Sequence, residues 1–383
     1  MRKIFIADLK DNTTVESIFL VASKSVRETK NGDPYLCITC QDKTGTIEAR
    51  VWDNALALEA RFQVDDFIAA RGRVSSFRDE LQLTLSDLDR IDEEGIDLKD
   101  FLPHSRWSAD ALFRSLETLI EEEVSSAEVR RFLKALFADP AFQKAYQRAP
   151  AAVTNHHNYL AGLLEHSLSM ARLAIALGRH YQTYYPAMVD TDLLIAGCVI
   201  HDMGKVEELS FGRSFDYSTV GRLVGHIPIG SERVSEVARS MDPPLDPNLE
   251  MQLKHLVLSH HGRQEYGAPV IPRTAEATLL HFLDMIDSRM NMCWNATEEH
   301  LSAPNPREGW TDYLRVLSGS LYIGGDAASG WKGTDELANE SGGPGVAPGP
   351  FVPASSKKER KPSLEEDKEA RSDPNPNLSL FGE

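Results

Sequence analysis

The residues that could do chemistry gather in the second half of the chain, where histidines recur beside aspartates. The pair His201-Asp202 ends the apolar run LLIAGCVIHD, just before Gly204. Neighbouring side chains on a helix point about 100° apart, so this imidazole and carboxylate could contact two metals, or one metal and a bridging water. His166 follows the apolar run LAGLLEH, and Asp284 closes ATLLHFLD. The sequence predicts that these groups face a helical core.

Three further histidines share this pattern. His226 lies in VGHI, and His260-His261 closes the apolar run HLVLSHH. One buried histidine is usually a satisfied core residue. Several histidines and carboxylates at core-facing positions are harder to explain in that way, because burying an unpaired charge costs several kcal/mol. The sequence therefore predicts a metal centre, and imidazole with carboxylate ligands suits Mn²⁺, Fe, Co²⁺ or Zn²⁺ rather than Ca²⁺.

Groups that could hold a phosphate lie close to these motifs. Lys205 follows Asp202 by one helical turn, and we predict that its ammonium group acts on the phosphate as a point charge. The alternative is a solvated lysine at a helix end. His157 and Arg263 are further candidates for substrate binding. Asp202 and Lys205 are thus the predicted catalytic residues.

The elements that must position these groups are helices. From about residue 105 to 325, apolar residues recur at helical spacing, for example in DALFRSLETLIEE and LAGLLEHSLSMARLAIALGRHY. We expect Asp192 to cap one helix and Asp139-Pro140 to begin another. We divide the region into a helical linker, residues 96–150, and a catalytic domain, residues 151–325.

The first 95 residues predict a small β-barrel. Five stretches are rich in β-branched residues and often alternate: TVESIFLVAS, PYLCITCQD, GTIEARVWD, DFIAARGRVSSF and ELQLTLSDLDRI. Turn signals separate them, and a helical stretch at Asn54–Phe62 follows the third. This order and the phrase DKTGTIEARVWD resemble an OB-fold of the kind attached to nucleic-acid enzymes.

Aromatic side chains of such a barrel can stack on bases, at about 1–3 kcal/mol per base. Tyr35, Phe77 and Arg78 are the predicted contacts with a single strand, whereas we expect Trp52 to pack in the barrel core. Because stacking reads no sequence, little base specificity is expected.

The histidine and aspartate motifs resemble those of the HD-domain superfamily, whose pattern is a His, an adjacent His-Asp and a distant Asp. More closely, HHNYLAGLLEHSL, HDMGK, VGHI, LSHHGRQEYGAP and HFLDMIDSRM resemble the YhaM-type 3′-to-5′ exoribonucleases. The resemblance covers about 320 residues. It implies a multidomain chain in which an OB-fold, residues 1–95, precedes an all-α HD domain, residues 151–325.

The resemblance also implies how the metals are bound. One metal would take His166, His201, Asp202 and Asp284. A second would take Asp202, His226 and His260, with His261 as a ligand or a close neighbour. The resemblance favours Mn²⁺ and makes a homo-oligomer plausible. Two metals about 3.5–4 Å apart suit phosphodiester cleavage, since they lower the pKa of a shared water and neutralise the phosphate oxygens.

Composition limits the other possibilities. The net charge of −17 counts mildly against a nucleic-acid binder, although local charge can differ from the total. No apolar run reaches 18 residues and no signal peptide is recognisable, so we expect a cytoplasmic protein without a membrane partner. Cys37 and Cys40 form a lone CxxC without the second pair that a zinc site would need. We interpret them as reduced core cysteines.

The chain from residue 326 to 383 is rich in Gly, Pro, Ser and charge, a composition typical of disorder. It ends in the apolar cluster Leu378, Leu380 and Phe381, which resembles the pentapeptide that docks bacterial proteins on the DNA sliding clamp. Asn377 departs from that motif, which usually starts with Gln. Chance is the alternative explanation, and clamp docking would point to DNA as much as to RNA.

Three hypotheses for the function follow. The first is a metal-dependent 3′-to-5′ exonuclease acting on single-stranded RNA or DNA. The second is an HD phosphohydrolase of free nucleotides or cyclic dinucleotides, against which the barrel counts because a small substrate needs no strand-binding domain. The third is a clamp-tethered single-strand-binding module with a structural metal. The sequence leaves the native metal and the choice between RNA and DNA open.

Overall fold

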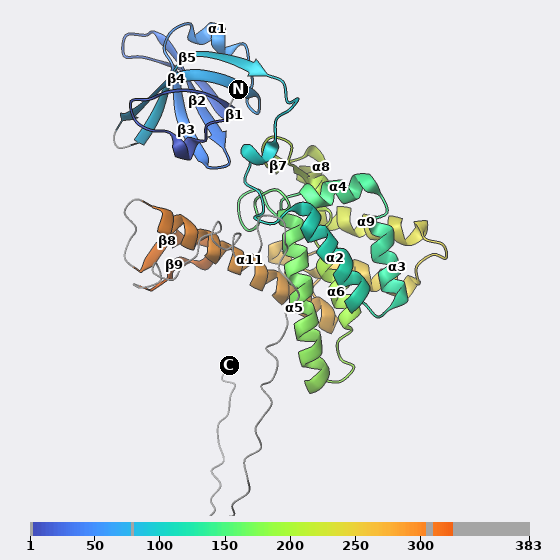
Figure 1. Cartoon of the computed structure of the whole chain (residues 1–383). Coiled ribbons are helices and arrows are strands. Elements are labelled where there is room, and N and C mark those ends of the chain that lie inside the picture. Colours follow the sequence, from blue (N-terminus) through green and yellow to red (C-terminus); the bar gives the residue numbers. More distant parts are fainter. Residues whose placement is uncertain (1–2, 78–79, 304–308, 325–383) are drawn as a thin grey trace, which may run out of the picture. The chain divides into compact units, whose positions relative to one another are not determined.

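The computed structural model describes residues 3–77, 80–303 and 309–324. Its first part is a closed five-stranded barrel with the strand order β1-β2-β3-β5-β4 (Figure 1). Strands β3 and β5 pair in parallel, and the other neighbours are antiparallel. The barrel elements are β1 (Thr14–Glu28), β2 (Pro34–Asp42), β3 (Gly45–Val51), α1 (Ala55–Glu59), β4 (Phe67–Phe77) and β5 (Glu80–Ile91).

Alternation along the strands explains why this segment closes into a barrel. In β4, Ile68, Ala70 and Val74 point into the core, while Arg71 and Arg73 between them are exposed. The inward side chains of all five strands form one apolar cluster. The predicted strands and the OB-fold are therefore confirmed.

The expectation for Trp52 was wrong. It is 44% exposed and stacks on Tyr35, with ring centroids 4.7 Å apart. Val51, the last residue of β3, is buried, so the alternation places the following tryptophan on the outer face.

The rest of the described chain is mainly helical, as predicted. The helix α6 is buried along most of its length and packs against α5, α10 and α11. A helix that is apolar all round belongs in the centre of a core, and α6 ends directly before His201-Asp202. The helices are α2 (Ala109–Glu123), α3 (Ala127–Leu136), α4 (Pro140–Arg148), α5 (Gly162–Tyr184), α6 (Thr191–Ile200), α7 (Lys205–Glu208), α8 (Thr219–Leu223), α9 (His226–Ser240), α10 (Pro247–Ser259) and α11 (Ala275–Ser302).

Two hairpins interrupt this helical part and were not predicted. They are β6 (Leu209–Ser210) with β7 (Asp216–Tyr217), and β8 (Trp310–Leu314) with β9 (Gly319–Tyr322). Strands this short offer too few positions for an alternating pattern to be recognised. Short 3₁₀ turns complete the description: η1 (Ile6–Asp8), η2 (Leu98–Asp100), η3 (Gln264–Tyr266) and η4 (Arg315–Leu317).

One of the two predicted helix starts is confirmed. Asp139 caps α4, and Pro140 is its first residue. The prediction for Asp192 was wrong, because Asp190 caps α6. Asp192 instead accepts hydrogen bonds from the backbone N–H groups just before α3, so its carboxylate joins two helices rather than starting one.

Several expectations concern segments outside the described residues. These are Arg78 and the whole tail from 326 to 383, including the predicted docking residues Leu378, Leu380 and Phe381. None of the helices in the described part of the chain is long and apolar enough to cross a membrane. Cys37 and Cys40 are buried free thiols, as expected.

Candidate metal centre

The helical part contains a buried cluster of histidines and carboxylates around Asp202. Asp202 lies in the turn after α6 and is only 2% exposed. Its Oδ2 lies 3.3 Å from His201 Nε2. Its Oδ1 lies 3.4 Å from His226 Nε2 and 3.5 Å from His260 Nε2. The two oxygens of one carboxylate therefore face two different groups of histidines.

The first group is completed from α5 and α11. His166 Nε2 lies 3.3 Å from Oδ1 of Asp284 and 4.0 Å from Oδ2 of Asp202. Helices far apart in the sequence thus supply ligand atoms to one side of Asp202.

The second group is completed by His261, whose ligand atom lies within 4.8 Å of those of His226 and His260. His226 is the first residue of α9, and the His260-His261 pair follows α10 directly. The structure thus brings together all the residues that were predicted as metal ligands: His166, His201, Asp202, His226, His260, His261 and Asp284.

The spacing of these atoms fits bound ions. Two ligands that each lie about 2.1 Å from one ion are about 3.0–3.4 Å apart. The distances of 3.3–3.5 Å from Asp202 to His201, His226 and His260 are close to this spacing. An ion could therefore enter each group with small movements of the side chains.

An oxygen acceptor holds Nδ1 in each of the five histidines, and Nε2 of His166, His201, His226 and His260 points toward the carboxylates of the cluster. Such a hydrogen bond orients the ring and leaves the lone pair of the neutral imidazole on Nε2. The acceptors are Asp287 for His166 at 2.8 Å, the Cys198 carbonyl for His201 at 3.0 Å, Glu208 for His226 at 2.9 Å, the Val257 carbonyl for His260 at 2.8 Å, and the Tyr266 carbonyl for His261 at 2.7 Å.

Four of the inward nitrogens and one oxygen of Asp202 have no hydrogen-bond partner. They are Nε2 of His166, His201, His226 and His260, and Oδ1 of Asp202, and all of them are buried. An unpaired buried polar atom costs about 1–3 kcal/mol. Five such atoms around one point are what a site for divalent ions requires, because coordination would satisfy all of them together.

The charges of the cluster are strongly coupled. Burial by itself raises the pKa of Asp202, but the charge of Lys205 and the neighbouring histidines hold it well below its usual range. Burial lowers the pKa of His166, but the nearby carboxylates of Asp284 and Asp287 outweigh burial and raise that pKa to about 10. A metal that binds at His166 must therefore displace a proton.

Lys205 is not a solvated lysine at a helix end. Its side chain is 11% exposed, and its Nζ donates a hydrogen bond of 2.7 Å to Oδ2 of Asp202. Burial lowers the pKa of Lys205, but the charge of Asp202 outweighs burial and the net pKa is raised. The ammonium group therefore stays charged at the edge of the cluster.

Gly204 allows the turn after Asp202 to approach the start of α9. A Cβ at this position would collide with the carbonyl group of His226 and lie 2.9 Å from the backbone nitrogen of Gly230. A larger residue would therefore separate His226 from Asp202.

Asp287 contacts the cluster directly but was not predicted from the sequence. Its Oδ2 accepts hydrogen bonds from His166 Nδ1 at 2.8 Å and from His157 Nε2 at 2.9 Å, and its Oδ1 accepts one from the Ser169 hydroxyl. Burial raises the pKa of Asp287, but these histidines lower it far more. Its position three residues after Asp284 on one helix was the available signal, since residues three apart share a face.

Glu208 was missed as well. It is 7% exposed, and its Oε1 accepts hydrogen bonds of 2.9 Å from both the backbone N–H and the Nδ1 of His226. Its neighbour Glu207 is exposed. Two adjacent glutamates look alike in the sequence, so only the fold separates the one that orients a ligand.

His156 is the third missed residue. Its Nε2 is buried without a hydrogen-bond partner and lies within 4.8 Å of the ligand atoms of His166 and Asp284. Burial, followed by the charges of Lys205 and His166, lowers the pKa of His156 to about 3. It is a neutral imidazole directed at the first group of ligands.

His157 and Arg263, the two predicted substrate-binding residues outside the cluster, differ in whether their side chains are available. Both ring nitrogens of His157 already have partners, Tyr159 Oη at 2.7 Å and Asp287 at 2.9 Å. This geometry speaks against phosphate binding by His157, which instead supports Asp287. Arg263 is exposed close to His261 in the chain, so its guanidinium is accessible to a substrate.

On the barrel, the predicted contacts Tyr35 and Phe77 lie in β2 and at the end of β4. Phe77 is 50% exposed, and Tyr35 stacks with Trp52 as described above. Arg50 lies 6.0 Å from the centre of the Trp52 ring. The barrel therefore presents an aromatic pair beside a cation on its outer surface.

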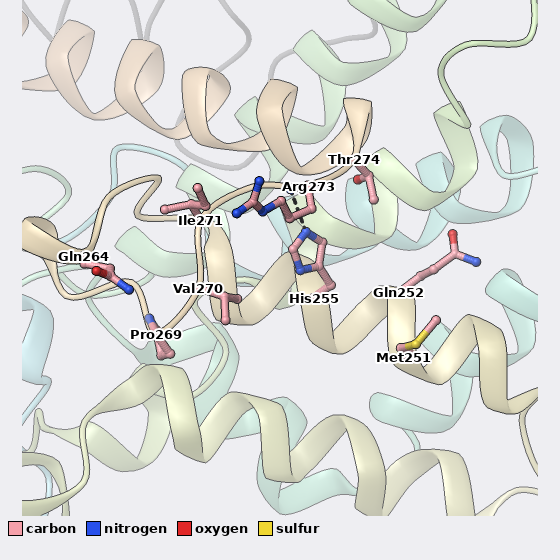
Figure 2. A pocket seen from close by; sticks show the side chains of 9 residues that line it. All are labelled: Met251, Gln252, His255, Gln264, Pro269, Val270, Ile271, Arg273 and Thr274. Atoms are coloured by element: carbon pink, nitrogen blue, oxygen red, sulfur yellow. Dashed lines mark hydrogen bonds between the residues drawn. The ribbon is translucent and has the colours of Figure 1, made fainter.

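Not every histidine of this region belongs to the centre. A hollow of about 540 Å³ lies along α10 and the segment after η3, and Figure 2 shows His255 and Arg273 beside it. His255 Nε2 accepts a hydrogen bond of 3.0 Å from the backbone N–H of Arg273 (Figure 2). This histidine therefore fixes a loop.

Comparison with known families agrees with this architecture. Residues 163–289 match the family described as HD domain, and residues 20–91 match the one described as OB-fold nucleic acid binding domain. The chain is thus an OB-fold barrel followed by an HD domain, and the buried His-Asp cluster lies within the HD match.

Relatives that match about three quarters of the chain show which family of HD-domain proteins it belongs to. The protein called 3′-5′ exoribonuclease YhaM in Oceanobacillus iheyensis is 35% identical over 288 residues, which are 73% of this chain and 86% of that protein. The protein of the same name in Bacillus subtilis is 33% identical over 285 residues, 74% of this chain and 88% of that protein. The chain belongs to the YhaM family.

Among solved structures, the second OB-fold domain of replication protein A from Methanococcus maripaludis covers 25% of this chain at 19% identity. It is covered along its whole length, with a TM-score of 0.21.

Proposed function

We propose that this chain is a metal-dependent 3′-to-5′ exonuclease that hydrolyses phosphodiester bonds in single-stranded RNA or DNA. The observation that carries the proposal is the set of histidines whose Nδ1 atoms are held by acceptors and whose Nε2 atoms meet around the two oxygens of Asp202. The name of the relatives supports attack from the 3′ end and RNA as a substrate. The OB-fold supports a polymer rather than a free nucleotide.

The donor set fits two divalent ions that share Asp202. His166, His201 and Asp284 would hold one, and His226, His260 and His261 the other. We propose Mn²⁺, with Co²⁺, Fe or Zn²⁺ as alternatives of suitable ligand preference. When bound, such ions supply an activated water and neutralise phosphate charge.

The chain's own residues have distinct jobs in this proposal. Asp202 bridges the two groups because each of its oxygens faces one of them. Lys205 lies at the edge of the cluster and binds a phosphate oxygen once Asp202 is engaged elsewhere. Arg263 adds a second cation from an exposed position. His156 presents an unpaired nitrogen beside His166.

We extend the proposal to the other parts of the chain. Residues 1–95 would hold the strand through Tyr35, Phe77 and Arg78, residues 96–150 would link, and residues 151–325 would cleave. Leu378, Leu380 and Phe381 would dock on a DNA sliding clamp, supported by their likeness to a docking pentapeptide. A titration of the clamp with a peptide of the last residues tests this point.

The decisive test is a cleavage assay with purified protein on matched 5′-labelled RNA and DNA strands, with Mn²⁺, Co²⁺, Mg²⁺ and Zn²⁺ in parallel. We expect stepwise shortening from the 3′ end and protection by a blocked 3′ end. Release of internal fragments would contradict the direction of attack. Hydrolysis of nucleotides or cyclic dinucleotides without shortening of either strand would favour an HD phosphohydrolase of small substrates.

A further inference from the structure

A second hollow lies between the segment that follows the barrel and the residues just before α5. We call it the linker pocket. It has a volume of about 470 Å³, within the range of about 300–1,000 Å³ that small ligands occupy. One wall is formed by residues 96–99 and 104–109, and the other by Gln147, Arg148, Leu160 and Ala161.

The two walls are fixed against each other by backbone hydrogen bonds. The N–H of Ser105 donates to the Leu160 carbonyl at 2.9 Å, and the N–H of Leu160 donates to the Pro103 carbonyl at 2.9 Å. The Ala161 N–H donates to the carbonyl of Arg148 at 3.1 Å. The hollow is therefore part of a packed structure.

The lining is basic. Lys99, Arg106 and Arg148 are permanent cations in this lining. The only carboxylate of the lining is Asp97, which already accepts a hydrogen bond from the N–H of Lys99. Among the described residues, the side chains of Lys99, Arg106 and Arg148 form no salt bridge. The pocket thus gathers positive charge, although the chain as a whole has a net charge of −17.

The lining also has an apolar part. Leu98, Trp107 and Leu160 line the pocket together with the cations. Arg106 stacks between two rings, with its Cζ 4.8 Å from the centre of Trp107 and 5.4 Å from that of Trp294. Cations beside an apolar wall suit a nucleotide unit, whose phosphate is anionic and whose base has a flat face that can stack on apolar side chains.

The pocket is joined to the metal centre through α5. Ala161 lines the pocket, and His166 follows five residues later, about 7.5 Å along the helix at about 1.5 Å per residue. The hollow of Figure 2 has a single permanent cation in its lining, Arg273, and thus lacks this character.

We propose that the linker pocket binds the phosphodiester backbone of the substrate strand at a nucleotide upstream of the one being removed. This inference rests on the proposed exonuclease function and adds a binding subsite to it. The subsite would contribute affinity only for strands long enough to reach it, and a dinucleotide would be cleaved without its help.

The test compares Lys99→Ala/Arg148→Ala with Lys134→Ala/Arg179→Ala. All four side chains are exposed or largely exposed, so the fold should persist. The control pair removes the same charge from residues that pair with Glu121 and Glu123 away from the pocket. Binding of a fluorescent 12-nucleotide single strand is measured in EDTA, which separates binding from cleavage.

We expect the pocket variant to bind the strand roughly tenfold more weakly at low salt. The slope of log Kd against log salt should fall by about 0.7 for each lost phosphate contact, or about 1.4 for both. With Mn²⁺, hydrolysis of a dinucleotide should equal that of the unaltered protein. The control variant should keep both the affinity and the slope.

Unchanged affinity and slope in the pocket variant would overturn the proposal, as would an equal loss in the control. Binding of a nucleoside monophosphate that the pocket variant loses, with unchanged strand affinity, would also overturn it. Failure of the unaltered protein to shorten any strand would refute the exonuclease function alone, because the EDTA measurement reports on the pocket independently.

Discussion

The cores of the barrel and of the helical part differ in the kind of side chain that they bury. The barrel core is an apolar cluster in which inward positions such as Phe19, Leu36 and Leu83 carry no charge. The helical part ends its most buried helix in His201-Asp202 and surrounds that pair with more imidazoles and carboxylates. Near this pair, polar atoms are left without partners, and each costs folding free energy.

The difference shows that the buried polar groups which lower the free energy of unfolding lie in the candidate metal centre. The barrel carries its functional groups outside, as in the stacked pair Tyr35 and Trp52, so they can change without disturbing the core. The metal centre is inside, so its ligands are also core residues. Substitutions on the outer face of the barrel should therefore change function without changing stability. Substitutions in the metal centre should change both.

The largest effect is expected for Asp202→Asn. Losing the shared carboxylate should lower kcat by about 10³-fold or more, since the group contributes to both sites. The change also leaves Lys205 buried without its partner, at a cost of about 3–5 kcal/mol. Cleavage rates and thermal unfolding are measured together. Retention of most of the activity in a folded variant would contradict the bridging role.

A companion variant separates the two consequences. His260→Gln leaves the hydrogen bond between Lys205 and Asp202 in place, so it should lose activity with a smaller loss of stability. Equal destabilisation by both variants would show that the loss of activity reports unfolding.

Asp287→Asn should have the next largest effect. The carboxamide can still accept a hydrogen bond from His166 but carries no charge, and outer-shell partners of this kind typically affect metal affinity by about 10–100-fold. Calorimetric titration with Mn²⁺ measures it. Glu299→Gln, an exposed position on the same helix α11, is the matched control, and an unaltered Mn²⁺ affinity in Asp287→Asn would remove its assigned role.

Trp52→Ala tests the barrel side of the comparison. We expect weaker binding of a single strand by about 1–3 kcal/mol, with kcat at saturating substrate and the melting temperature nearly unchanged, because Trp52 lies outside the core. Fluorescence anisotropy and thermal melts check this. A large drop in melting temperature would mean that the stacked pair is structural.

A final prediction concerns the pH dependence of stability. The pKa of His166 is raised to about 10, so the stability that its charged form contributes is full below about 6.5 and is lost as the pH rises to about 10. The melting temperature of the metal-free protein should fall over this window. Mn²⁺ should stabilise more at higher pH, because it displaces that proton. The fall should be absent in His166→Gln, and an equal fall there would assign it to other groups.

Several of the candidate metal ligands could be predicted from the sequence because they close apolar runs, as His201-Asp202 does after LLIAGCVI, whereas His226 in VGHI was assigned through the family resemblance. The residues that hold those candidate ligands could not, because the residues they contact lie far away in the sequence: Asp287 meets His166 across 121 positions. Glu208 differs from Glu207 only in the direction that a short helix gives it. The sequence analysis named His157 but not His156, because the sequence does not show that His156 lies beside His166 and Asp284 while His157 contacts Asp287.

The barrel was predictable strand by strand because alternation is local. The register that closes it was not, since the parallel pairing of Glu48 with Gln82 depends on the whole barrel. The prediction for Trp52 was wrong for a different reason. This large apolar residue was assigned to the core, although the alternation of the strand already placed it outside.

The most direct test of the central claim is anomalous diffraction from crystals grown with Mn²⁺. The account predicts two manganese peaks about 3.5–4 Å apart, one beside Asp202 Oδ2 with His166, His201 and Asp284, and one beside Oδ1 with His226 and His260. A single peak, or peaks that Asp202 does not contact, would contradict it.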